Sequence, residues 1–226
     1  MKHKKIFEKV RKLIDERELD ADNLDTVYGE LTELVETDPQ CAWAFGLLSE
    51  IYFWFGQNAP DEDKLFCYEQ GVKFGEQGIA ADENCLEANV WLAVNYGFFG
   101  QEKGIMKSLS LVAPIKKLAE HAAELNESYF YGAPWRVLGR LYQFAPGFPI
   151  SVGNKKKALE CLEKALRLGP KFYLNHLFLA ELYIATGEKS KAKERLQWIL
   201  DAPLSKNYER EDADYKRQAQ SLLEKL

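Results

Sequence analysis

Residues 135–142, WRVLGRLY, decide the fold of this chain of 226 residues. Their pattern is W-x2-L-G-x2-Y, in which large apolar residues recur at helical spacing around a single glycine. Beyond a stretch of prolines and glycines, a second helical pattern begins at Ala158 and ends at a proline, Pro170. Small residues such as Gly139 and Ala158 let two helix backbones approach closely. The stretch therefore predicts a tightly packed pair of antiparallel helices over residues 132–170.

The first of these patterns is the opening signature of a tetratricopeptide (TPR) repeat, a unit of two helices that stacks on neighbours of its own kind. The same frame fits the chain four times. The small residues at the first-helix anchor are spaced by 44, 46 and 41 residues, and they are Ser49, Ala93, Gly139 and Ala180. Four matches in one register predict an all-α fold, a TPR-like α-solenoid of helix-turn-helix repeats.

We expect residues 1–226 to form a single TPR-like domain. It would consist of an N-terminal helix pair, four repeats and a capping helix that covers the exposed end of the array. The expected bounds are 4–39 for the N-terminal pair, 42–84, 86–128, 132–170 and 173–204 for the repeats, and 208–226 for the capping helix.

Three of the four repeats have lengthened turns. Ala180 and Ala192 are 12 residues apart, whereas the equivalent residues in the three preceding repeats are 22, 22 and 19 apart. The extra residues fall within 53–65, 97–111 and 144–154, and they include several aromatic residues next to glycine. Turns of one kind emerge on one edge of a solenoid. We expect these lengthened loops either to pack on one another and cap that edge or to form the lid of a pocket.

The repeat register also predicts which side chains of the first helices line their exposed face. Most of these side chains are aromatic or apolar, and a few are charged. Arg136 and Arg140 lie one helical turn apart and share a face. They are suited to hold a carboxylate or a phosphate, or alternatively they pair internally with Glu50, Glu181 or other acids. The candidate residues for binding a ligand or a partner are Trp43, Trp54, Val94, Phe98, Arg136, Arg140, Phe144 and Phe148.

Composition and motifs argue against several function classes. The net charge of −5 and the pI of about 5.4 do not favour a nucleic-acid-binding protein. No nucleotide-binding or hydrolase motif occurs, and the histidines and cysteines lack metal-ligand spacing. We therefore expect no enzyme activity, no catalytic residues, no metal and no cofactor. The four cysteines are expected to be small buried side chains: Cys41, Cys67, Cys85 and Cys161.

The N-terminus is basic, but no apolar core of a signal peptide follows it. No run approaches the roughly 18 apolar residues that a membrane-spanning helix needs. These features predict a cytoplasmic protein without a membrane span. A periplasmic location is the alternative if the natural N-terminus is longer.

Several short runs together carry a family resemblance over roughly residues 70 to 205. They are YGAP at 131–134, LGRLY at 138–142, APGFP at 145–149, SVGNKKKAL at 151–159, GIMKSL at 104–109 and Asn175-His176. The chain resembles the T-component family of TRAP transporters. More distantly, it is similar to the regulator of microtubule dynamics proteins, another group of the TPR type.

The T-component resemblance implies a non-catalytic, TPR-like interaction scaffold that can form a ring-like homo-oligomer. It also implies a protein partner, the periplasmic solute-binding subunit of a TRAP transporter. The alternative function is a small-molecule binding protein that encloses an apolar organic acid under the aromatic rim loops. Both expectations concern binding rather than catalysis.

Overall fold

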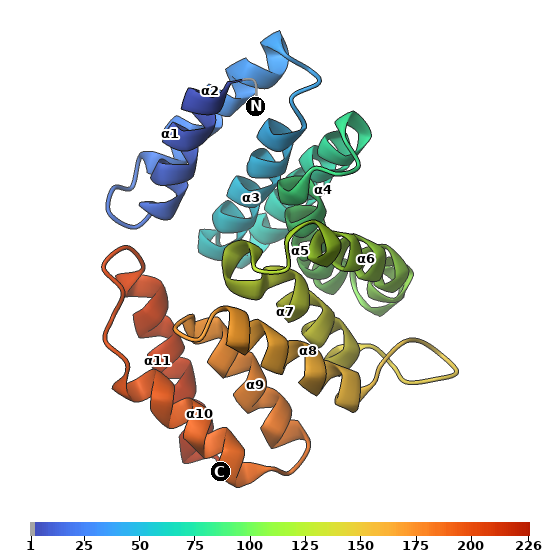
Figure 1. Cartoon of the computed structure of the whole chain (residues 1–226), viewed down its shortest axis with the longest axis vertical. Coiled ribbons are helices and arrows are strands. Elements are labelled where there is room, and N and C mark those ends of the chain that lie inside the picture. The colour runs from blue at the N-terminus through green and yellow to red at the C-terminus, as the bar shows by residue number, and fades with distance from the viewer. Residues whose placement is uncertain (1–2) are drawn as a thin grey trace. The chain divides into compact units, whose positions relative to one another are not determined.

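In a computed structural model that describes residues 3–226, the chain is built from helices joined by short connections (Figure 1). Eleven helices lie within this described part of the chain. The chain divides into two compact units, unit 1 up to Asn126 and unit 2 from Glu127 onward. Each unit is an array of antiparallel helix pairs, which confirms the all-α repeat architecture.

Unit 1 contains three helix pairs, and in each pair a first helix is followed by a second helix. Within the unit, α3 packs along α4 and α5, and α5 packs along α6. The six helices are α1 (Lys4–Asp15), α2 (Asn23–Thr37), α3 (Ala42–Asn58), α4 (Asp61–Ala81), α5 (Leu86–Lys103) and α6 (Ile105–Asn126).

Unit 2 contains two helix pairs and a last helix. The turn between α9 and α10 contains Gly187 at a φ of 81°, the left-handed conformation in which glycine commonly ends a helix. The five helices are α7 (Tyr129–Phe144), α8 (Lys155–Leu168), α9 (Tyr173–Ala185), α10 (Lys189–Asp201) and α11 (Glu209–Glu224).

The extra residues of the first two lengthened turns lie in helices, not in loops. Only Ala59 and Pro60 separate α3 from α4, and only Gly104, at a φ of 94°, separates α5 from α6. Our interpretation of residues 53–65 and 97–111 as long aromatic loops is therefore wrong. An insertion at a turn can extend both flanking helices by about one turn each, which keeps the added backbone hydrogen-bonded.

The third lengthened turn is a true loop, residues 145–154, between α7 and α8. Its two ends are tied together by backbone hydrogen bonds, from Gly153 N to Pro146 O at 2.8 Å and from Asn154 N to Tyr142 O at 2.8 Å. The Asn154 side chain accepts a hydrogen bond from Lys157 N at 3.0 Å. Asn154 is therefore the N-cap of α8.

Small residues hold the paired helices close together at the predicted anchors. The Ser49 hydroxyl on α3 donates to the carbonyl oxygen of Gly71 on α4 at 2.7 Å. The Asn95 side-chain amide on α5 donates to the carbonyl oxygen of Ser49 at 2.8 Å. A methyl group at Gly71 would lie 2.5 Å from the Asn95 side chain. Three helices thus meet where no larger residue fits.

Gly139 in unit 2 occupies the equivalent anchor and provides a stability test. A Cβ atom added at Gly139 would lie 2.6 Å from Leu162 on α8. We expect Gly139→Leu to lower the free energy of unfolding by about 1–3 kcal/mol through overpacking. Urea unfolding measures this change, and Gly29→Leu is the control because no atom lies within 4 Å of the added Cβ there. Equal stability of the two variants would show that the repeat register is wrong.

The last helix, α11, closes the apolar side of α9 and α10. Its Ala219 is completely buried in a cluster with Tyr173, Leu177 and Leu196. The Lys216 ammonium group donates to the carbonyl oxygen of Leu200 at 2.7 Å, at the end of α10. Charged side chains occupy most of the remaining surface of α11, which is the composition expected of a capping helix.

Candidate functional site

The first helices of unit 1 carry a cluster of aromatic side chains that we name the aromatic face. It is centred on Phe53, whose ring centroid lies 4.7 Å from that of Trp54, 5.4 Å from that of Trp91 and 5.4 Å from that of Phe98. Phe53 and Phe98 are half-buried, so part of their surface is available to a partner. The face consists of Phe53, Trp54, Trp91, Val94, Gly97 and Phe98.

Gly97 opens a space in the aromatic face. It lies on α5 one helical turn after Val94, on the same side of the helix. A Cβ atom built at Gly97 would have no atom within 4 Å, in contrast to the crowded glycines of α4. A glycine inside a helix costs about 0.5–1 kcal/mol relative to alanine. Helix packing does not require this glycine, so the open space is a candidate binding position.

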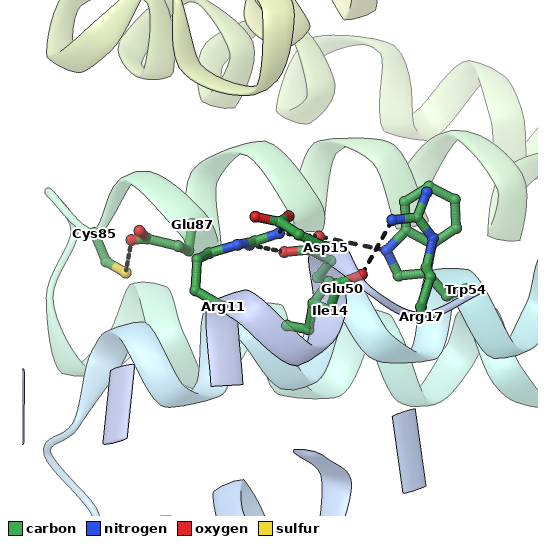
Figure 2. A network of polar contacts seen from close by, with 8 residues as sticks. All are labelled: Arg11, Ile14, Asp15, Arg17, Glu50, Trp54, Cys85 and Glu87. Carbon is green, nitrogen blue, oxygen red and sulfur yellow. Dashed lines mark hydrogen bonds and ion pairs between the residues drawn. The ribbon is translucent and has the colours of Figure 1, made fainter. Parts of the chain in front are cut away.

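A buried carboxylate lies beside the aromatic face. Glu50 on α3 is fully buried, and its two oxygens accept hydrogen bonds from the Arg11 guanidinium of α1 at 2.5 and 2.9 Å (Figure 2). The Trp54 indole N–H also donates to Glu50, at 3.3 Å. Two parallel N–H bonds from an arginine to a carboxylate form a strong and directional pair. This pair fixes α1 on α3.

Two further contacts place α1 against the aromatic side chains of α3. The Arg17 guanidinium carbon, from the turn after α1, lies 3.7 Å from the Trp54 ring centroid, and an Arg17 N–H donates to the Ile14 carbonyl oxygen at 3.1 Å (Figure 2). The Phe7 ring meets the Trp43 ring edge-on at 5.1 Å. Trp43 and Trp54 are therefore covered within the chain.

Glu87 on α5 is a second acid next to the Arg11–Glu50 pair, and it accepts a hydrogen bond from the Cys85 thiol at 3.7 Å (Figure 2). Burial raises the pKa of Glu87. Hydrogen bonds from its own backbone N–H and from the Cys85 thiol and the charge of Arg11 lower this pKa, and the negative charge of Glu50 raises it slightly. Burial and the nearby Glu87 raise the pKa of Cys85 to about 12, so this thiol stays protonated and unreactive at neutral pH.

The raised pKa of Glu87 gives a prediction for the pH dependence of stability. The folded state holds the Glu87 proton more tightly than the unfolded state, so the stability that this group contributes falls as pH rises above the usual value of 4.5. We expect Glu87→Gln to be more stable than wild type at neutral pH, with the difference disappearing below that value. Urea unfolding at several pH values tests this, with the exposed Glu83→Gln as control. A gain that persists at low pH would contradict the assignment to ionisation.

In unit 2, Arg140 forms a half-buried cluster on the first helices. Its guanidinium pairs with the carboxylate of Glu181 on α9, and its carbon lies 3.8 Å from the Phe178 ring and 4.4 Å from the Phe144 ring. An Arg140 N–H also donates to Gln143 Oε1 at 3.1 Å. Burial lowers the pKa of Arg140, and Glu181 opposes this shift. Internal pairing with Glu181, one of the two alternatives for this arginine, is thus confirmed.

Arg136 lies deeper and belongs to a buried polar cluster that we name the Arg136–Asn175 cluster. An Arg136 N–H donates to Asn175 Oδ1 at 2.9 Å, and two others lie 3.3 Å from the carbonyl oxygens of Phe130 and Tyr131. The guanidinium carbon is 4.8 Å from the Phe172 ring. Burial lowers the pKa of Arg136 to about 10, which still leaves it charged at neutral pH.

The backbone beside Arg136 is left-handed over three residues. Phe130, Tyr131 and Gly132 have φ values of 43°, 59° and 81°. Left-handed conformations cost roughly 1–2 kcal/mol for residues other than glycine. The Asn175 amide donates to the Tyr131 carbonyl oxygen at 3.0 Å and reaches the carbonyl oxygens of Ala165 and Gly169 at the same distance. These hydrogen bonds hold the strained turn in place.

The structure gives the sequence-predicted binding residues unequal access to a partner. Trp43, Trp54 and Arg136 are buried. Val94, Phe98 and Arg140 are half-buried, and Phe144 and Phe148 are exposed. The two arginines contact separate sets of side chains, so each has its own environment and the two do not form a joint fork for one ligand. Ligand or partner binding by any of these residues stays a prediction.

Arg11, Arg17 and Asn175 are polar residues whose roles the sequence pattern did not predict. Each acts across helices that are far apart in sequence. The sequence contains one indirect indication of them. Glu50 and Arg136 are charged residues at helix positions that face the array, where an uncompensated charge is costly. Such positions require partners, but the sequence does not name them.

Between residues 3 and 226, no group of three or more His, Cys, Asp or Glu side chains is arranged to hold a metal ion. The four cysteines are free and buried, which confirms that part of the expectation. Within the same residues, no helix has the length and hydropathy to cross a bilayer.

Solved structures define the class of this fold. A thermophilic TPR protein of Thermus thermophilus superposes with a TM-score of 0.68, covering 96% of this chain and 98% of its own, at 18% identity. MamA superposes with a TM-score of 0.52, covering 92% of this chain and 97% of its own, at 14% identity. At these identities the likeness shows the fold alone, and the chain is a TPR-like α-solenoid.

The family follows from the sequence. The family model described as regulator of microtubule dynamics protein 1-3 matches residues 6–145 and 152–226, and the chain belongs to this family. Regulator of microtubule dynamics protein 1 of Bos taurus is 23% identical over 239 residues, which cover 97% of this chain and 72% of that protein. The more distant of the two resemblances in the sequence is thereby confirmed, and the T-component resemblance stays a prediction.

Proposed function

We propose that this chain is a non-catalytic protein-interaction scaffold and that the aromatic face of unit 1 binds a partner polypeptide. The observation that carries the proposal is the open space at Gly97, among half-buried aromatic side chains on a first helix. Tryptophan, tyrosine and arginine dominate the binding energy of protein interfaces, and interfaces favour well-packed pockets. First helices are also the surfaces that TPR-type arrays use to bind partners.

The contacts of the aromatic face favour a preformed site. Phe53 touches three other aromatic rings, and Trp54 is fixed by Glu50 on one side and by Arg17 on the other. Side chains that are already ordered lose less entropy when a partner binds. A partner side chain that enters the space at Gly97 would lie next to Phe98, whose ring already packs on that of Phe53.

The experiment compares two glycines that both have open space around them. Gly97→Trp fills the space in the aromatic face, and Gly29→Trp adds the same side chain to α2, a second helix. We expect affinity purification from native lysate to recover a stoichiometric partner with wild type and Gly29→Trp. Binding of the purified partner should fall by at least about tenfold in Gly97→Trp. Equal binding by all three proteins, with both variants folded, would reject the aromatic face as the site.

The nature of the partner is a further part of the proposal. The resemblance to T-components supports the solute-binding subunit of a TRAP transporter, whereas the bovine relative carries the name of a regulator of microtubule dynamics. Two purified proteins, a TRAP solute-binding subunit and tubulin, distinguish these possibilities in the same binding assay. A TRAP permease encoded next to this chain would favour the first.

A second candidate function has its own observation in unit 2. Arg140 lies between the rings of Phe144 and Phe178, a setting in which a guanidinium can bind the carboxylate of an apolar acid. Glu181 already pairs with Arg140, so an acid ligand would have to displace or share it. Native mass spectrometry of gently purified protein detects such a ligand. Arg140→Met should abolish its binding, and retention of the ligand would reject this function.

A further inference from the structure

Loop 145–154 of unit 2 presents large apolar side chains to solvent. The Phe148 side chain is 94% exposed and that of Ile150 is 75% exposed, while Phe144 at the end of α7 is 65% exposed. Clustered exposed side chains of this size mark an interaction surface more often than chance exposure does. Hydrogen bonds between the ends of the loop hold its base on α7 and α8. The fold therefore presents an apolar tip on a fixed base.

The charge around this tip differs from that of the rest of the chain. The chain has 30 basic and 35 acidic residues, yet residues 139–159 contain four basic residues and no acid. Three of the four are Lys155, Lys156 and Lys157, which are exposed and follow the loop directly. The tip is thus flanked by positive charge within an acidic protein.

The lysines stand at a helix end whose charge does not favour them, although the Lys155 ammonium donates to the Gln143 carbonyl oxygen at 3.2 Å and that of Lys157 lies 5.5 Å from the Tyr142 ring centroid. They occupy the first turn of α8, which has no acidic residue. The N-terminus of a helix carries a partial positive charge, so cations there are destabilising. An anionic surface that contacts this turn would reverse the cost, because the lysines and the helix end would then attract the same charges.

We propose that loop 145–154 docks this chain on the surface of a bilayer that contains anionic lipids. Phe148 and Ile150 enter the interfacial layer, and the lysines contact the lipid headgroups. Consecutive helical residues point about 100° apart, so the three lysines point in different directions around the start of α8, next to the loop. A headgroup layer surrounds an inserted loop and can therefore contact all three lysines, whereas the surface of one partner protein would contact only some of them. Apolar burial and attraction to anionic lipids add in such binding.

This inference goes beyond the proposed scaffold function and is independent of it. The matched residues of the family model end at 145 and resume at 152, so the tip with Phe148 and Ile150 lies outside them. The aromatic face belongs to unit 1, whereas the loop belongs to unit 2. A scaffold without membrane binding, or membrane binding without a protein partner, would each be recognised by separate assays.

Sedimentation with vesicles tests the proposal on the full chain. The two compositions are phosphatidylcholine alone and an equimolar mixture of phosphatidylcholine and phosphatidylserine. We expect binding to the mixed vesicles only, weakened by added salt. The double variant Phe148→Ser, Ile150→Ser should lower the partition coefficient by at least about tenfold. Lys155→Gln with Lys156→Gln should lower it by about fivefold per lysine.

Matched controls distinguish docking through the loop from nonspecific adsorption to vesicles. Phe66→Ser removes a side chain that is 58% exposed but close to the acidic first turn of α4, and Lys193→Gln with Lys206→Gln removes two exposed lysines elsewhere. These controls should bind like wild type. The proposal is wrong if wild type does not bind mixed vesicles, or if the loop variants bind as well as the controls. It is also wrong if the loop variants lose a protein partner but keep vesicle binding.

Discussion

Arg11→Met is expected to lower the free energy of unfolding of unit 1 by about 3–5 kcal/mol. The variant leaves the fully buried Glu50 carboxylate without its two guanidinium hydrogen bonds, while the longer bond from the Trp54 N–H remains. Breaking a buried ion pair from one side is costly because the remaining charge stays out of water. Urea unfolding followed by hydrogen exchange measures the loss separately for helices α1 to α6.

Two further variants give this prediction its controls. Arg217→Met removes an arginine from an exposed ion pair with Asp214 and should change stability by less than about 0.5 kcal/mol. The double variant Arg11→Met, Glu50→Leu removes both charges and should recover most of the lost stability. If the double variant were as unstable as Arg11→Met, the loss would come from packing of the Arg11 stem rather than from the buried charge.

Asn175→Leu is expected to lower the free energy of unfolding of unit 2 by about 3 kcal/mol. The change removes the acceptor of the buried Arg136 and the amide donor shared by the carbonyl oxygens of Tyr131, Ala165 and Gly169. The left-handed turn at 130–132 would then lose one of the contacts that hold its strain. Hydrogen exchange should rise most in α7 and in the turn between α8 and α9.

Asn175→Asp separates the two roles of this side chain, which accepts a hydrogen bond from Arg136 and donates to backbone carbonyl oxygens. An aspartate keeps an acceptor for Arg136, but it has no N–H to donate to the three carbonyl oxygens. We expect a loss smaller than that of Asn175→Leu, because the buried guanidinium keeps its partner. A loss as large as that of Asn175→Leu would show that the carbonyl side of the cluster, where an anionic oxygen replaces the N–H donor, dominates the effect.

The repeat architecture was predictable because it depends on local spacing. Ser49, Ala93, Gly139 and Ala180 mark close helix contacts, and such positions recur at a readable period. The location of the inserted residues was not predictable from that period. Aromatic-glycine runs at residues 53–65 and 97–111 read as loops, but the helices continue through most of them. A count of inserted residues does not say whether they extend a helix or a loop.

The polar contacts were less predictable because they join distant parts of the chain. Arg11 and Glu50 are 39 residues apart, and Asn175 and Tyr131 are 44 apart. The left-handed conformation at Phe130 and Tyr131 is also unexpected, since bulky residues rarely adopt it. Only Gly132 and the following Pro134 hinted that a helix starts there after an unusual turn.

The charged outward face of α11 has a consequence for assembly. An array of repeats grows or aggregates end to end only while its last apolar side is free. Here Ala219 fills that side, and the outward positions of α11 carry Arg210, Asp214, Arg217 and Glu224. Any homo-oligomer that uses this outward face of α11 would therefore form through polar contacts, and stacking of further repeats on the face is disfavoured.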